Sequence, residues 1–258
     1  MKSIFNVVTG LFIVCSMFLG IANAQEPATV LAQELTLERK KWEPLKVGMA
    51  PGFAPFEFKN DKGEWNGFDV DIAKELATVL GTKLEIVEKK WEDLITALTQ
   101  REIDVIISGM SITLDRARIV YFSQPYFETG QVVLLLKGKE VNLNQKRLEI
   151  GVLTESTGEK IATKEFPEAK IVYFSVEAEI VKALVNQEVK AMVIDKPYAD
   201  NLVRKDERIE MLPRLLEIEK YAFAIRRGDL DFLFYLNHFI DYLKYTGRYQ
   251  EICSKWFK

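Results

Sequence analysis

From residue 45 onward, short apolar runs alternate with segments whose apolar residues recur every three or four positions. The apolar runs at 45–50, 84–87 and 104–108 contain few polar residues, which is typical of strands buried on both faces. The segments at 70–80 and 91–98 between them have helical periodicity. This alternation predicts an α/β fold, in which mostly parallel strands are linked by helices on both faces of a sheet.

The ends of the first of these helices carry recognisable signals. Asp69 precedes its apolar stripe, and aspartate is a common N-terminal cap. Gly81 follows the stripe, where a glycine often ends a helix in a left-handed conformation. We therefore expect Asp69 to cap the helix and Gly81 to end it.

The second half of the chain repeats this plan. Strands are expected at 148–153, 170–173 and 191–194, with helices that begin at Ser156 and at Ala178. In the two halves, Gly109 and Asp195 both come just after a buried strand. Ligands of open α/β sheets bind outside the carboxyl ends of the strands, so two such sheets that face each other predict a cleft between two lobes.

Two extended apolar runs, at 131–136 and 221–225, are candidates for crossings between the lobes. The alternative is that both are ordinary core strands of a single lobe. The aromatic-rich tail at 230–257 has a helical period and packs on lobe 1 if the second run returns there. The predicted division is an N-terminal arm or helix at 25–44, lobe 1 at 45–134 and 224–258, and lobe 2 at 135–223.

The first 24 residues are unlike the rest. Lys2 is their only charged residue, an apolar run covers 4–21, and Ala22-Asn23-Ala24 fits a signal-peptidase site. This predicts a cleavable signal peptide at 1–24 and a periplasmic protein. A membrane anchor is the alternative, since the apolar run is almost long enough to span a bilayer.

Composition narrows the function classes. A net charge of -3 gives no basic excess, so we expect no nucleic-acid partner. The chain has one histidine, His238, and two cysteines, Cys15 and Cys253. This scarcity argues against a zinc site or a Cys–His nucleophile, and we expect neither a metal nor a cofactor.

Six stretches of the chain follow a known family pattern: 53–58, 67–71, 91–98, 104–116, 122–126 and 247–257. Together they resemble the polar-amino-acid solute-binding proteins of ABC importers (bacterial solute-binding protein family 3). The resemblance implies the type II periplasmic binding protein fold, with two α/β lobes that are joined by two hinge strands. It also implies a monomer that binds a polar or neutral α-amino acid by lobe closure and delivers it to an ABC transporter permease.

An α-amino acid buried in such a cleft needs a cation for its carboxylate and an acid for its ammonium group. Arg116, just after a possible Thr113 cap, can make two parallel bonds to a carboxylate. Taken alone, Arg116 also fits a surface arginine, and Asp195 also fits a helix or turn cap. The resemblance implies that Arg116 holds the carboxylate and Asp195 the ammonium group.

The resemblance assigns further residues to the site. Phe53 and Trp91 correspond to the two aromatic positions that enclose the ligand side chain, although core packing is the usual role of such residues. Ser156 is expected to cap a helix whose free N–H groups suit a carboxylate. The remaining predicted ligand-binding residues are Ser108, Gly109, Ser111 and Thr157.

One departure from the family pattern concerns the ligand. Relatives that take cationic amino acids often have Asp where this chain has Ala50, which argues against a basic ligand unless Glu57 or Glu155 compensates. Two alternatives to transport remain open. A cyclohexadienyl dehydratase-like enzyme on the same fold would use Glu155 or Asp195 as its acid, and a sensory domain would need a membrane-spanning segment after the lobes.

Overall fold

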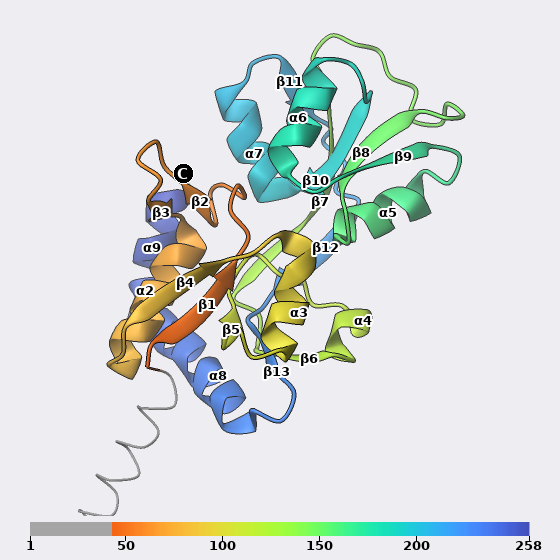
Figure 1. Cartoon of the computed structure of the whole chain (residues 1–258). Coiled ribbons are helices and arrows are strands. Elements are labelled where there is room, and N and C mark those ends of the chain that lie inside the picture. Colours follow the sequence, from red (N-terminus) through yellow and green to blue (C-terminus); the bar gives the residue numbers. More distant parts are fainter. Residues whose placement is uncertain (1–42, 258) are drawn as a thin grey trace, which may run out of the picture. The chain divides into compact units, whose positions relative to one another are not determined.

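The structure is a computed structural model that describes residues 43–257 (Figure 1). The predicted signal peptide at 1–24 and all but the last two residues of the predicted arm at 25–44 lie outside these residues. Within the described range, no helix has both the length and the apolar character that a membrane span requires.

One sheet is built from the two ends of the described chain. It has five strands, and helices α2 (Phe68–Leu80), α3 (Leu94–Thr99) and α8 (Leu230–Tyr245) pack around it. A 3-10 turn, η1 (Trp91–Asp93), leads into α3, and a four-residue helix, α4 (Leu114–Ala117), precedes the last strand in the list below. In spatial order the strands are β4 (Leu84–Glu88), β1 (Leu45–Met49), β5 (Val105–Ile106), β13 (Ala224–Arg226) and β6 (Val120–Phe122).

The other sheet has six strands and is built from the middle of the chain. Helices α5 (Thr157–Glu165), α6 (Glu177–Val185) and α7 (Lys196–Lys205) contact it. In spatial order its strands are β11 (Ile209–Met211), β7 (Phe127–Leu136), β10 (Ala191–Asp195), β8 (Glu149–Leu153) and β9 (Lys170–Phe174), with β12 (Glu217–Tyr221) also paired to β7.

Both sheets are mixed, whereas the sequence predicted mostly parallel sheets. Strands β1, β4 and β5 are parallel, as are β8, β9 and β10. The reversed strand is β13 in the first sheet, where it pairs antiparallel with β5 and β6, and β7 in the second, where it pairs antiparallel with β10, β11 and β12. The α/β class and the strand–helix alternation are confirmed, but the local pattern did not reveal the direction of these later strands.

Strand alternation places the core on both faces of each sheet. In the first sheet, Val105 belongs to the cluster that contains Leu76 of α2 and Leu236 of α8, while its neighbour Ile106 packs with Leu98 of α3. In the second sheet, Val193 packs with Ala162 of α5, and the next residue of β10 packs with residues of α6 and α7. Helices therefore cover both faces, as predicted (Figure 1).

The long strand β7 and the strand β12 run side by side from Phe127 to Gln131. The chain then leaves β12 at Tyr221 and enters the first sheet at Ala224, so the single apolar run expected at 221–225 is divided between two strands. Ser111, which follows β5, forms a bridge to Tyr221. The boundaries of the two lobes and their hinge strands stay a prediction.

The C-terminal helices α8 and α9 (Arg248–Trp256) pack on elements from the start of the described chain. The Tyr249 hydroxyl donates a hydrogen bond to the Tyr126 carbonyl, and the Trp256 indole donates one to Asp71. Phe257 packs edge-on against Phe68 of α2. A two-stranded hairpin, β2 (Phe58–Lys59) with β3 (Trp65–Asn66), lies between β1 and α2.

Candidate functional site

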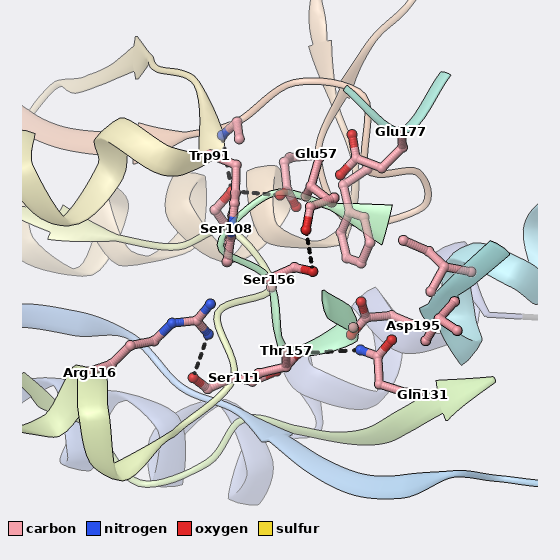
Figure 2. A pocket seen from close by; sticks show the side chains of 17 residues that line it. Glu57, Trp91, Ser108, Ser111, Arg116, Gln131, Ser156, Thr157, Glu177 and Asp195 are labelled. Atoms are coloured by element: carbon pink, nitrogen blue, oxygen red, sulfur yellow. Dashed lines mark hydrogen bonds between the residues drawn. The ribbon is translucent and has the colours of Figure 1, made fainter. Parts of the chain in front are cut away.

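A cavity of about 460 Å³, counted with its opening, is lined by residues from both sheets and their loops (Figure 2). Every residue that the sequence analysis assigned to the site lines it, although these residues are spread over almost 150 positions of the chain. They are Phe53, Trp91, Ser108, Gly109, Ser111, Arg116, Ser156, Thr157 and Asp195.

Arg116 is positioned by the first turn of α4. The Thr113 hydroxyl accepts a hydrogen bond of 3.2 Å from the Arg116 N–H, so the predicted cap is present. The guanidinium group is buried, donates to the Ser111 carbonyl at 3.0 Å and lies 5.0 Å from the Trp91 ring centroid. It also donates to the Glu155 carbonyl at 3.1 Å, which joins the loop before α5 to α4.

The guanidinium group of Arg116 is a buried positive charge that can bind a negatively charged ligand group. Burial lowers the pKa of its guanidinium, and the nearby carboxylates of Glu219 and Asp195 act in the opposite direction. Arginine stays protonated in proteins even when its pKa falls. A buried cation with two parallel donors is suited to hold a carboxylate.

Asp195 is the last residue of β10. It is also the N-cap residue of α7, but its side chain makes no capping bond, so the capping alternative is wrong. Its carboxylate instead accepts a hydrogen bond from the Tyr221 hydroxyl of β12. Burial raises the pKa of Asp195 to about 7, and Glu219 adds to this effect. A cationic group in the cavity would offset both the desolvation of the Asp195 carboxylate and its repulsion by Glu219.

The start of α5 forms one wall of the cavity. The Ser156 hydroxyl accepts a hydrogen bond of 3.1 Å from the Glu159 N–H, so the predicted cap is present. Thr157 accepts a bond of 3.4 Å from Gln131 of β7. A Cβ atom at Gly158 would lie 3.1 Å from Gln131 and 3.2 Å from the Val193 carbonyl, so the backbone packs closely here.

The loop after β5 forms the opposite wall. Gly109 has a φ of 54° and donates its N–H to Asp69 at 2.7 Å. A Cβ atom there would lie 2.9 Å from the Phe53 ring, so both the conformation and the space require glycine. Asp69 therefore holds this loop, and the expectation that it caps α2 is wrong, because the N-cap residue is Gly67 and no side chain caps it.

The two aromatic residues assigned to the site each pack against another side chain. Phe53 stacks on Tyr198 of α7 with ring centroids 5.6 Å apart and planes within 9°. Trp91 lies beneath Arg116, and its indole N–H donates to the Glu155 carbonyl at 3.3 Å. Both rings line the cavity and so present flat apolar surface to it.

Lining residues that the sequence analysis did not assign include Glu57, Gln131 and Glu177. Glu57 lies in a Gly/Pro-rich loop, and the sequence suggests for it only the role of a compensating acid. Gln131 is fully buried. A polar residue at the start of an apolar run is unusual, and this feature of the sequence could have indicated a site residue. Glu177 begins α6, where an acid is unremarkable in a sequence.

Burial raises the pKa values of the two additional acids, Glu57 and Glu177. Desolvation and the nearby Asp69 hold the pKa of Glu57 well above its ordinary value. Desolvation raises the pKa of Glu177 to about 7. Glu155, the other compensating acid that was considered, does not line the cavity with its side chain, and only its carbonyl enters the network described above.

An exposed ion pair lies at the edge of this network. Lys160 of α5 pairs at 2.6 Å with Asp115 of α4, next to Arg116. Within residues 43–257, no group of histidine, cysteine and acidic side chains is arranged to hold a metal ion.

The model of the bacterial extracellular solute-binding proteins, family 3, matches residues 45–258, and so covers both sheets and the whole cavity. The chain belongs to this family. Membership assigns to it the binding of a solute outside the cytoplasm, rather than catalysis. The family resemblance inferred from the sequence is therefore confirmed.

Individual relatives agree with this assignment. The solute-binding protein is 35% identical over 223 residues to a "Probable histidine-binding protein" of Neisseria gonorrhoeae, with 82% of each chain covered. A putative ABC transporter binding component of Wolinella succinogenes, solved with lysine, has 36% identity and a TM-score of 0.79, with 83% of this chain and 95% of that chain covered.

An ancestral amino acid-binding protein, described as a precursor of cyclohexadienyl dehydratase, is also similar in structure. It has 34% identity and a TM-score of 0.81, and the match covers 87% of this chain and 100% of that chain. The two-lobed type II fold of these proteins is thus shared by the solute-binding protein described here.

Proposed function

We propose that the protein binds an α-amino acid in the cavity between its lobes and delivers it to an ABC importer. One observation carries this proposal: Arg116, a buried cation on α4, and Asp195, a half-buried acid at the end of β10, line the same cavity. An amino acid carries the complementary pair of charges on one carbon. The names of the relatives, which include histidine-binding and lysine-bound proteins, support an amino acid as the solute.

Each lining residue has a role in this proposal. Arg116 holds the ligand carboxylate, with the free N–H groups at the start of α5, near Ser156 and Thr157, as further donors. Asp195 holds the ammonium group. Ser108, Gly109 and Ser111 form the wall that supplies hydroxyl and backbone partners, while Phe53 and Trp91 pack against the ligand side chain.

The mechanism is a shift of population toward a closed state. Lobe 1, at 45–134 and 224–258, contributes Arg116, and lobe 2, at 135–223, contributes Asp195. A ligand that contacts both favours closure around the hinge strands β7 and β12. We propose that the protein acts as a monomer in the periplasm, after cleavage of a signal peptide at 1–24, and hands its ligand to the permease.

The dehydratase alternative is less supported. It draws on the likeness to the ancestral protein described as a dehydratase precursor, but that protein is itself named an amino acid-binding protein. The pair formed by Arg116 and Asp195 fits an amino acid better than a substrate without an ammonium group. Incubation of the protein with prephenate and arogenate, followed by product analysis, tests the alternative.

The proposal is tested by thermal unfolding with a panel of L-amino acids and with analogues that lack either the α-amino or the α-carboxyl group. At a ligand concentration of 100 times Kd, a true ligand raises the midpoint temperature by about 5 °C or more. Both analogues should give little or no shift. Equal shifts with the amino acid and its deaminated analogue would contradict the proposal.

A further inference from the structure

Two acids of the cavity have no role in holding the α-amino and α-carboxyl groups. Figure 2 shows Glu57 and Glu177 on the side of Trp91 and Ser108, with Arg116 and Asp195 on the opposite side. The same separation appears in the electrostatics. Arg116 is influenced by Glu219 and Asp195, whereas Glu57 is influenced by Asp69 and Glu177.

Glu177 reaches the cavity from the first residue of α6. Its side chain is 8% exposed, and within residues 43–257 it makes no ion pair or side-chain hydrogen bond with another residue. In Figure 2 its carboxylate points toward Glu57. It also lies close to the loop before Phe53, because a Cβ atom built on Gly52 would be 3.7 Å from its Oε2 atom.

Glu57 approaches from the other lobe. One of its carboxyl oxygens accepts a hydrogen bond of 2.6 Å from Ser108, and its side chain is 1% exposed. Its negative charge is opposed by Asp69 and by Glu177. No lysine or arginine other than Arg116 is among the described residues that line the cavity, so this pair of acids has no cation of its own there.

Charge balance then determines what the cavity accepts. The carboxylate and ammonium groups of an amino acid are matched by Arg116 and Asp195, which leaves the carboxyls of Glu57 and Glu177 beside the ligand side chain. A neutral side chain would leave two desolvated acids without a partner, and an acidic one would add a third. A positively charged side chain compensates them, and the nearby faces of Phe53 and Trp91 suit such a group.

We propose that Glu177, together with Glu57, holds a positive charge on the ligand side chain, so that the amino acid taken by this cavity is basic. This inference rests on the proposed function of the same site. It also removes the argument against a basic ligand that rests on Ala50, which stands where relatives that take cationic amino acids often have Asp. The acid that this position lacks is supplied from the facing lobe, where Glu177 lies beside the loop that Ala50 begins.

The test compares basic amino acids with neutral analogues of nearly the same shape. Isothermal titration calorimetry at pH 8 is carried out with L-arginine against L-citrulline and with L-lysine against L-norleucine. At least one basic ligand should bind about 30-fold or more tightly than its neutral analogue. Glu177→Gln should reduce that ratio by about 10-fold or more and leave the affinity for the neutral analogue within about 2-fold.

Glu179→Gln is the matched control, because Glu179 is an exposed acid on the same helix, and it should leave the ratio unchanged. If a neutral amino acid binds as tightly as its basic counterpart, the cation site is wrong while amino-acid binding stands. If no amino acid binds, both proposals fail. The comparison of ligands on the unmodified protein decides the inference even if the variant does not fold.

Discussion

The guanidinium group of Arg116 lies 5.0 Å from the centroid of the Trp91 ring, and both groups donate to the Glu155 carbonyl. The indole that lines the cavity is thus coupled to the cation that we expect to receive the ligand carboxylate. A ligand that engages Arg116 changes the environment of Trp91 directly, without the need for a distant conformational signal.

Trp91→Phe should therefore remove most of the change in tryptophan fluorescence that ligand binding produces. The measurement is a fluorescence titration with the tightest amino acid of the panel. Trp65→Phe is the control, since Trp65 lies in the hairpin strand β3, beneath Lys59 and outside the cavity, and should retain the full change. An unchanged signal in Trp91→Phe would show that another tryptophan reports binding.

Arg116→Ala should weaken binding of the amino acid by about 3 kcal/mol, because it leaves a buried carboxylate without its charged partner. Isothermal titration calorimetry measures the loss. Arg118→Ala removes an exposed arginine at the end of the same short helix and should bind normally. If both variants bind alike, the carboxylate is held elsewhere.

Asp195→Asn should weaken binding less than Arg116→Ala, since the amide oxygen still accepts one hydrogen bond from the ammonium group. A deaminated analogue should bind the unmodified protein poorly and lose little more affinity in Asp195→Asn. Titration of both proteins with both ligands gives the coupling energy. A variant that weakens the two ligands equally would exclude Asp195 as the ammonium partner.

Glu177→Gln should stabilise the ligand-free protein at alkaline pH. Burial raises the pKa of Glu177 from 4.5 to about 7. As the pH rises from 4.5 to about 7, ionisation of this buried carboxyl therefore lowers the stability of the folded protein progressively. We expect Glu177→Gln to raise the free energy of unfolding by about 2 kcal/mol more at pH 8 than at pH 5. Urea unfolding at the two pH values measures this difference.

Other groups near Glu177 titrate as well, so the difference between the variant and the unmodified protein is what matters. Glu57 and the Tyr198 hydroxyl face it, and a groove beside it is lined by further charged residues. Glu179→Gln is the control and should give the same difference from the unmodified protein at both pH values. The charged residues of the groove are Glu88, Lys89 and Lys90.

Local patterns predicted the elements but not their directions. The apolar runs and helix signals gave β1, β4, β8, β9 and β10 and the caps at Thr113 and Ser156. Whether a strand runs parallel or antiparallel depends on where the chain enters each sheet. The local periodicity of apolar residues carries no information about this direction. The short strands of the hairpin, β2 and β3, were missed for lack of a repeating pattern.

The site was predicted mainly where the family resemblance assigned a residue. The helix position of Arg116 favoured a ligand role only mildly, and Asp195 by itself fitted a cap, but the resemblance assigned both to the ligand, and both line the cavity. Glu177 was not predicted, because an acid in the first turn of a helix is common. Asp69 was assigned to a cap for the same reason, although its partner is Gly109, 40 positions further along the chain.

The pair formed by Lys160 and Asp115 has a consequence for the speed of uptake. Both side chains are more than half exposed, so the pair adds little to affinity, and salt screens it. It nevertheless joins α5 to α4 beside Arg116, and in the proposed closure mechanism it breaks each time the lobes part. Under this mechanism we expect substitutions there to alter how long a solute is retained, while the choice of solute, which we assign to groups inside the cavity, stays the same. Residence time and selectivity can therefore evolve at separate positions of this molecule.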